Sequence, residues 1–269
     1  MILLLILGFG VGLALGLTGG GGMLAVPALI LGLGMTIQEA MPVALLAICF
    51  SAMIGTIDGL KKRIVRYKAG IIMAAAGIVI APFGIFLANI LPSNILISIF
   101  SILLMVISLK VFWGLIKNTK PPTGHESLTK NCLINPATGK FNWSPRCFFT
   151  MSGIGGFTGI FTGMLGVGGG FLIAPSIRYF SDLNTQSIVS TSLMVITLIS
   201  AGTVVQALSS GFTIEKDGLL FILTTILGVF LARKIAPFFL DVHLQLSFAI
   251  LAMLAAISLM YSQFLGGLI

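Results

Sequence analysis

Two glycine clusters are the parts of this 269-residue sequence whose composition and spacing suggest a chemical role. The clusters, together with one adjoining hydroxyl residue, consist of Thr18, Gly19, Gly20, Gly21 and Gly22, and of Gly166, Gly168, Gly169 and Gly170. Each glycine weakens a helix by about 1 kcal/mol relative to alanine. Each cluster therefore predicts the interruption of a helix, with backbone N–H and C=O groups left without partners at the break.

The helices that restart after these breaks predict a site for a small anion. The restarting segments begin near Met23 and Phe171. A helix N-terminus carries free N–H donors and about half a positive elementary charge. For an anion about 4 Å from one terminus, at an effective dielectric constant near 20, the attraction is about 2 kcal/mol. Such a site selects for charge without any arginine. The alternative is that the glycines serve only close packing or a hinge.

Prolines and hydroxyl residues accompany the clusters. Pro27 and Pro175 follow the two clusters at equivalent positions and are interpreted as structural helix-break residues. Thr191 and Ser192, near the start of a later apolar segment, are candidates to donate hydrogen bonds to the anion, although such hydroxyls also bond their own helix carbonyls. The hydroxyl residues further along that segment, including Ser200, are expected to make packing contacts.

The composition places these elements in a lipid bilayer. Of all residues, 57% are hydrophobic and 8% are charged, and the mean hydropathy is +1.14. An ordinary soluble domain carries about 25% charged residues. Several apolar segments reach the roughly 20 residues that a spanning helix needs. The predicted fold is an all-α polytopic membrane protein of the cell membrane, with no separate soluble domain.

The basic residues indicate how the chain lies in the membrane. The net charge is +8, and the basic residues gather in the loops. One short loop carries Lys61, Lys62, Arg63, Arg66 and Lys68. Basic residues beside spans mark the cytoplasmic side, so this loop and the polar stretch 117–147 are predicted to be cytoplasmic. Nucleic-acid binding is excluded as a function because it needs a basic face on an exposed element.

The sequence is duplicated. Glycines recur at a nearly constant shift: Gly8, Gly12 and Gly16 reappear as Gly155, Gly159 and Gly163. After one inserted residue, Val167, the shift continues through Pro27 and Pro175. The predicted organisation is a first membrane repeat at 1–116, a cytoplasmic linker at 117–147 and a second membrane repeat at 148–269. Each repeat is predicted to hold a glycine-broken helical segment followed by three transmembrane helices.

Loop charges predict that the two repeats are inverted relative to each other. The basic loop of the first half has a counterpart in the second half, 209–217, with one basic and two acidic residues. Conversely, Arg233 and Lys234 mark a loop whose first-half equivalent is uncharged. Inverted repeats are typical of secondary transporters, which bind their substrate at the repeat interface near the midplane.

The paired patterns around Gly19 to Pro27 and Gly163 to Pro175, followed by the Ser-Thr-Ser run that contains Thr191 and Ser192, resemble the TauE/SafE family of membrane transporters. The resemblance covers nearly the whole chain. It implies transport of small sulfur-containing anions, such as sulfite or organosulfonates, in the direction of export. Alternating access is the expected mechanism. The alternatives are an anion channel and a transporter of a different small anion.

Other chemistry finds little support in the sequence. The spans contain no cluster of histidine and acidic residues and no nucleophile beside a base, so an enzyme is not expected. No cofactor and no metal site are predicted, and Cys49, Cys132 and Cys147 are expected to be unpaired thiols. The expected partners are the anion and the lipid bilayer, and the sequence leaves the oligomeric state open.

Overall fold

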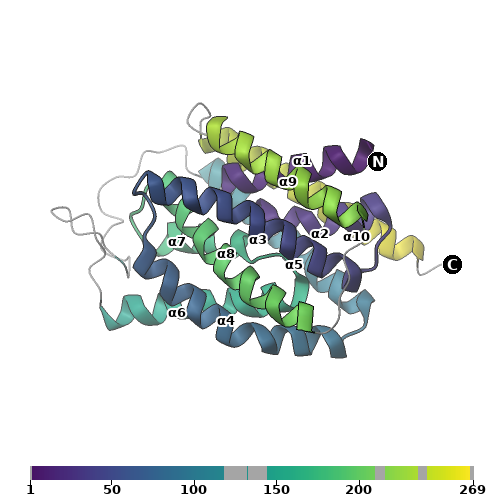
Figure 1. The fold of residues 1–269 in the computed structure, drawn as a ribbon, viewed down its shortest axis with the longest axis horizontal. Coiled ribbons are helices and arrows are strands. Elements are labelled where there is room, and N and C mark those ends of the chain that lie inside the picture. Colours follow the sequence, from purple (N-terminus) through teal and green to yellow (C-terminus); the bar gives the residue numbers. More distant parts are fainter. Residues whose placement is uncertain (1, 118–131, 133–143, 210–215, 236–240, 267–269) are drawn as a thin grey trace.

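A computed structural model describes residues 2–117, 132, 144–209, 216–235 and 241–266, and these form an all-helical protein (Figure 1). The first half contains α1 (Ile2–Thr18), the 3-10 helix η1 (Gly21–Leu24), α2 (Ala25–Leu33), α3 (Ile37–Lys61), α4 (Tyr67–Ile90) and α5 (Ser93–Lys117). The second half contains α6 (Pro145–Leu165), α7 (Gly170–Phe180), α8 (Thr185–Ser209), α9 (Lys216–Ile235) and α10 (Asp241–Gly266). Apart from η1, the described halves have the same order of helices: a broken pair followed by three further helices.

Several helices are long and apolar enough to cross a membrane. Within the described residues, six segments meet this condition: they lie in α3, α4, α5, α6, α8 and α9. The helices on either side of the breaks differ in length. Before the breaks, α1 has 17 residues and α6 has 21; after them, α2 has 9 and α7 has 11. At 1.5 Å per residue, the two short helices after the breaks are far shorter than the hydrocarbon core.

Local sequence explains where the helices begin and end. α3 starts at a capping box, in which the Thr36 side chain accepts the Glu39 N–H and the Glu39 carboxylate accepts the Thr36 N–H. α6 starts after Ser144, whose hydroxyl accepts the N–H of Cys147. Gly34 ends α2 in the left-handed conformation, which glycine adopts without steric cost.

Equivalent helices of the two halves make equivalent contacts. α1 packs along α9 and, in the matching arrangement, α6 packs along α4, while α3 packs on α8 and α5 on α10. The glycine stripes make the first two contacts close. A Cβ atom on Gly16 would lie 2.6 Å from the Cβ of Ala232, and one on Gly163 would collide with the carbonyl oxygen of Ala81. The stripes therefore serve helix packing, as small residues do in membranes.

The helix directions differ between the paired contacts. Along α1, Gly8 lies against Phe221 and Gly16 against Val229, so α1 and α9 run in the same direction. Along α3, Gly55 lies against Leu193 and Gly59 against Ser190, so α3 and α8 run in opposite directions. A twofold axis perpendicular to the membrane would make equivalent helices run in the same direction. The antiparallel α3–α8 pair therefore favours an axis in the membrane plane.

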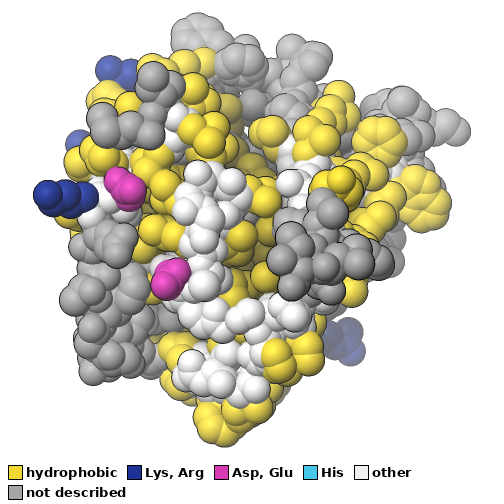
Figure 2. Space-filling model, turned by 90° about the vertical axis from the view of Figure 1, so that its right-hand side faces the viewer, with side chains coloured by type: hydrophobic (Ala, Val, Ile, Leu, Met, Phe, Trp, Pro, Cys, Tyr) yellow, Lys and Arg dark blue, Asp and Glu magenta, His cyan; other side chains and the backbone are white. Residues whose placement is uncertain are grey.

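The basic segments gather at one end of the molecule, called here the basic end. The loop between α3 and α4, the C-terminus of α9 and the N-terminus of α6 all lie there, at the left in Figure 1. The opposite end is shown in Figure 2, where the described side chains are mostly hydrophobic or uncharged with scattered charged groups. Most of the linker predicted at 117–147 and most of the loop 209–217 lie outside the described residues.

Two sequence interpretations need correction. Cys132 and Cys147 are joined by a disulfide, with Cα atoms 5.1 Å apart, so only Cys49 is a free thiol. The spacing of 15 residues gave no sign of this pairing, because the fold of the linker decides it. The prolines do not interrupt their helices: Pro27 lies in the first turn of α2 and Pro175 lies inside α7. The breaks come from the glycines.

Candidate functional site

Both predicted helix breaks are present at the glycine clusters. α1 ends at Thr18, and Gly19 takes a φ of +69° before η1 starts. α6 ends at Leu165, and Gly166, Gly168 and Gly169 have φ values of +68°, +67° and +64° before α7 starts. Three left-handed residues within four positions are strained for any residue except glycine. This requirement explains why the cluster has its composition.

The two breaks meet each other in the interior of the protein. A Cβ atom on Gly20 would lie 3.2 Å from the Cα of Phe171, and one on Gly170 would lie 2.5 Å from the carbonyl oxygen of Gly19. A Cβ on Gly22 would lie 3.3 Å from the carbonyl oxygen of Val167. The backbones of the two halves are therefore in direct contact, and we call residues 18–22 and 166–170 together the glycine junction.

Several backbone N–H groups at the glycine junction have no acceptor. In the first break the N–H of Gly20 donates to the Thr18 hydroxyl at 3.2 Å, but those of Gly21 and Gly22 form no hydrogen bond with any described residue. In the second break the same is true of the N–H groups of Gly168 and Gly169. All of these residues are buried. Buried donors without acceptors are rare and cost several kcal/mol each in a membrane interior.

Buried hydroxyl groups without partners lie beside the second break. Ser200 and Thr158 are fully buried, and among the described residues their hydroxyl oxygens form no hydrogen bond. A Cβ on Gly168 would lie 3.3 Å from the Ser200 hydroxyl, and one on Gly169 would collide with the Thr158 methyl group. A third such hydroxyl belongs to Ser51 of α3. The free Ser200 hydroxyl thus lies next to the free backbone N–H groups, and the Thr158 side chain lies beside Gly169.

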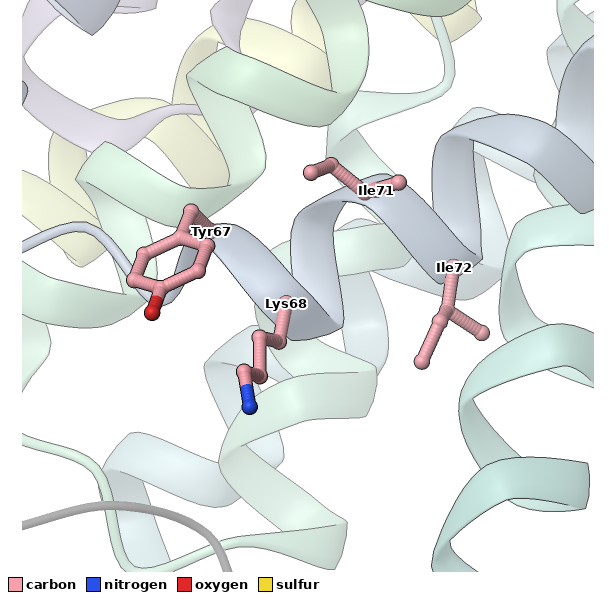
Figure 3. Close-up of a pocket in the computed structure, with 4 residues that line it drawn as sticks. All are labelled: Tyr67, Lys68, Ile71 and Ile72. Atoms are coloured by element: carbon pink, nitrogen blue, oxygen red, sulfur yellow. The ribbon is translucent and has the colours of Figure 1, made fainter.

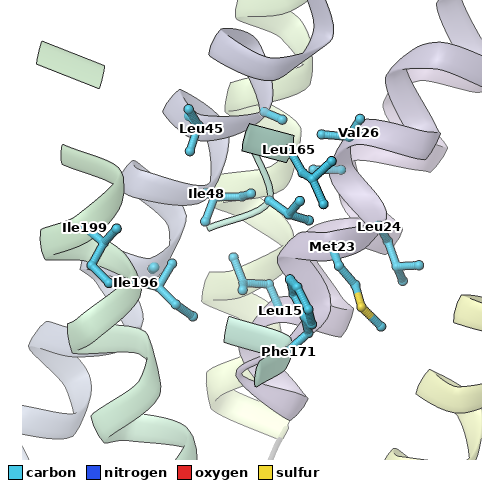
Figure 4. Packing of buried hydrophobic residues seen from close by; sticks show 14 of the residues in the cluster. Leu15, Met23, Leu24, Val26, Leu45, Ile48, Leu165, Phe171, Ile196 and Ile199 are labelled. Atoms are coloured by element: carbon cyan, nitrogen blue, oxygen red, sulfur yellow. The ribbon is translucent and has the colours of Figure 1, made fainter. Parts of the chain in front are cut away.

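The surroundings of the glycine junction are apolar and closed. Figure 4 shows hydrophobic side chains from both halves around it, including Leu15 and Met23 from the first half and Phe171 and Ile196 from the second. Leu15 and Met23 are fully buried, with no exposed surface. A low-dielectric shell strengthens every electrostatic interaction inside it. The glycines of the junction are thus buried away from water, whereas Thr18 is partly exposed.

The structure brings together most of the predicted site residues but separates Thr191 from them. Ser192 lies at the glycine junction, with its hydroxyl 2.6 Å from a Cβ built on Gly19, and it donates to the carbonyl oxygen of Val189 at 2.9 Å. Thr191 faces another way and accepts the backbone N–H of Arg66 at 3.0 Å. The Thr18 hydroxyl donates to the carbonyl oxygen of Ala14 at 2.8 Å and caps Gly20.

From its sequence context Ser200 is expected to make only packing contacts, but the spacing of residues along α8 indicates that it lies on the same side of the helix as Ser192. Ser192, Ile196 and Ser200 are spaced by four residues, which places them on one face of α8. That face runs along the glycine junction: Ser192 lies by Gly19, and Ile196 and Ser200 lie by Gly168. Thr158 carried no comparable signal, because its position beside Gly169 depends on how the chain turns after α6.

A surface depression elsewhere on the molecule is not part of this site. It is lined by Tyr67, Lys68, Ile71 and Ile72, which project from the first turns of α4 as Figure 3 shows. These residues lie at the basic end, and none of them belongs to the glycine junction. An aromatic and a basic side chain above two isoleucines are typical of the membrane–water boundary.

The fold and the glycine junction together define a polytopic membrane protein of the transporter class. Broken helices that meet between two structural halves, with free N–H groups in a buried apolar setting, are typical of secondary transporters. The chain belongs to the sulfite exporter TauE/SafE family, whose sequence profile matches residues 4–259. This confirms the resemblance found in the sequence, and the family is one of transporters, not of enzymes.

Two curated relatives support this assignment. Both are described as probable membrane transporter proteins of Xylella fastidiosa; one, from strain Temecula1, is 27% identical and the other, from strain 9a5c, is 25% identical, each over 189 residues. The alignments cover 69% of this chain and 66% of each relative, so the chain spans just under two thirds of their length. No solved structure matches the chain.

Proposed function

We propose that the protein is a secondary transporter that carries small sulfur-containing anions, such as sulfite or an organosulfonate, across the cell membrane in the direction of export. The observation that carries this proposal is the set of buried donors without acceptors at the glycine junction, from Gly21, Gly22, Gly168 and Gly169. An oxyanion between the two breaks would satisfy these donors. It would also accept hydrogen bonds from Ser200 and Thr158.

The chemistry of the site fits a small anion that must leave again. Neutral N–H and hydroxyl donors attract an oxyanion, but they bind it less tightly than an arginine would. Two helix N-termini meet at the glycine junction, that of α7 and that of the continuous helical segment Gly21–Leu33 formed by η1 and α2, and each would attract the anion by about 2 kcal/mol. The name of the family adds that the anion is of the sulfite type.

The arrangement of the two halves supports transport by alternating access. We take the halves to be inverted repeats, because the antiparallel α3–α8 contact is what an axis in the membrane plane produces. In inverted repeats the two halves exchange conformations, so a site between them opens first to one side and then to the other. The buried state of the glycine junction is then an occluded intermediate, which favours a carrier over a channel.

A flux experiment tests the proposed site. The protein is reconstituted in liposomes, and sulfite uptake is compared between the wild type, Ser200→Ala and Thr158→Val. A hydrogen bond to a charged group contributes about 1.5 kcal/mol or more, so each change should weaken sulfite transport about tenfold. Removing a hydroxyl that has no partner should leave the thermal unfolding temperature nearly unchanged.

Thr203→Val provides the matched control. Thr203 lies one turn beyond Ser200 on α8 and is also buried, but its hydroxyl already donates to the carbonyl oxygen of Ile199 at 2.9 Å. We expect this variant to transport sulfite at the wild-type rate. Equal transport by all four proteins would show that the free hydroxyls do not contact the anion. Single-channel currents far above carrier turnover would contradict the carrier mechanism.

A further inference from the structure

Two arginines at the basic end, Arg66 before α4 and Arg233 of α9, form hydrogen bonds with hydroxyl groups of α8. Arg233 of α9 donates from Nη2 to the Ser190 hydroxyl at 2.9 Å, and the backbone N–H of Arg66 donates to the Thr191 hydroxyl at 3.0 Å. The two arginines, from different halves, are therefore anchored on consecutive residues of α8. The next residue of this helix, Ser192, already lies beside Gly19 of the glycine junction.

The Arg66 side chain has an unmet donor. Its Nε atom is buried, and it forms no hydrogen bond within the described part of the chain. A guanidinium group is always charged and is built to donate two parallel hydrogen bonds to a carboxylate, sulfite or phosphate group. A buried guanidinium N–H without an acceptor is costly, so the position calls for an oxyanion.

The surrounding charges leave this position positive. Asp58 is the acidic neighbour: it accepts from Arg233 and from Lys62, each at 3.0 Å. Its carboxylate is thus already engaged by two other cations, while no described carboxylate contacts Arg66. The Arg233 side chain is only 10% exposed. Because little water surrounds it, dissolved salt screens its positive charge only weakly.

We propose that Arg66, with the neighbouring charge of Arg233, forms a second oxyanion-binding site at the basic end, separate from the glycine junction. If the oxyanion bound here is the transported anion, this inference rests on the proposed function. The same chemistry fits the phosphate of a lipid headgroup. If it serves transport, the site would concentrate the anion at the basic end, next to the α8 residues that lead to the glycine junction.

Arg66→Gln and Arg63→Gln are the variants that test this site. Both variants remove one positive charge from the same loop. Arg63 differs from Arg66 in being exposed, and we expect glutamine at position 63 to keep the backbone φ of 55°. Arg66→Gln retains the backbone N–H that donates to Thr191. If it unfolds, Arg66→Lys replaces it, since lysine keeps the charge but not the two-pronged donor.

The first arm measures sulfite binding by calorimetry in nanodiscs of phosphatidylcholine at fixed pH and salt. The second arm measures thermal stabilisation by phosphatidylglycerol without sulfite. We expect Arg66→Gln to bind sulfite about tenfold more weakly than Arg63→Gln does. A selective loss in the lipid arm would instead assign the site to a headgroup phosphate. Identical behaviour of the two variants in both arms would overturn the site.

The outcomes separate this proposal from the proposed function. If the wild type binds sulfite and Ser200→Ala weakens that binding, but the two arginine variants are alike, only the second site is wrong. If the wild type binds no sulfite at all, the proposed function is wrong as stated. The lipid arm then decides alone whether Arg66 holds an oxyanion.

Discussion

The Nε atom of Arg233 lies 3.0 Å from the Oδ2 atom of Asp58, and this ion pair joins α9 of the second half to α3 of the first half. The side chains are 10% and 30% exposed, so the pair is largely shielded from water. Any movement that opens the basic end between these helices must separate the two groups. The pair therefore contributes to holding the halves closed at that end.

Replacing Asp58 by asparagine should destabilise the protein by about 1 to 2 kcal/mol. Among the described residues, the change leaves the Arg233 guanidinium with the Ser190 hydroxyl as its remaining hydrogen-bond partner, and it removes the carboxylate that balances the charge. Breaking a fully buried pair costs about 3 to 5 kcal/mol, and the partial exposure of Asp58 reduces this cost. The measurement is the midpoint of thermal unfolding in detergent.

Two further variants control this measurement. Lys62→Gln removes the other cation on Asp58, but the Lys62 side chain is 50% exposed, so the cost should be about 0.5 kcal/mol or less. The exchange of Asp58→Arg with Arg233→Asp should recover part of the lost stability. A double variant that is as unstable as the sum of the two single changes would show that the ion pair contributes nothing.

Gly159→Leu should destabilise the contact between α6 and α4 by at least about 2 kcal/mol, because inserted side-chain atoms in a packed interior force backbones apart. A Cβ on Gly159 would collide with the carbonyl oxygen of Gly77. Gly153 on the same helix is the control: nothing lies within 4 Å of its Cβ position. Gly153→Ala should keep or raise the unfolding temperature. Equal tolerance of both changes would contradict the close packing.

The sequence allowed the halves and the breaks to be predicted because both depend on local signals. A glycine at every fourth position, as at Gly8, Gly12 and Gly16, makes a stripe wherever the helix goes. A run such as Gly19 to Gly22 ends a helix in any surroundings. Because the sequence is duplicated at a nearly constant shift, the same features could be expected at the equivalent positions of the second half.

The contacts between distant residues could not be predicted in this way. Asp58 and Arg233 are 175 positions apart, and the sequence marked Arg233 only as a basic residue of a loop. The roles of Thr191 and Ser192 separate because adjacent helical residues point about 100° apart, and which of them meets Gly19 depends on how α8 is rotated. The pairing of Cys132 with Cys147 depends on where the linker returns to α6.

The oxidation state of Cys132 and Cys147 tests the predicted orientation of the chain. The disulfide lies at the basic end, where positive residues predict the cytoplasm. Thiols in the cytoplasm are kept reduced. We therefore expect all three cysteines to be alkylated when intact cells are treated with a permeant reagent, and Cys49 alone after purification in air and unfolding without reductant.

The opposite result would revise the orientation. If the Cys132–Cys147 bond is already present in cells that have been alkylated before lysis, the basic end faces an oxidising compartment. The linker would then lie outside the cytoplasm, and the predicted orientation of the chain in the membrane would be reversed. Cys132→Ser, which cannot form the bond, serves as the control for complete alkylation of the remaining thiols.

Thr191→Val and Ser192→Ala should have opposite effects, although the two residues are adjacent and fully buried. Thr191→Val removes the acceptor of the Arg66 N–H at the start of α4, so it should cost about 1 kcal/mol of stability and leave sulfite transport within about twofold. Ser192→Ala removes a hydroxyl that lies beside Gly19 and, unlike that of Thr203, could turn from its own helix carbonyl to the anion, so stability should change little while transport falls about fivefold. Thermal unfolding and liposome flux on both variants measure this. If Thr191→Val lost transport without losing stability, the anion would contact Thr191 and the site would extend toward the basic end.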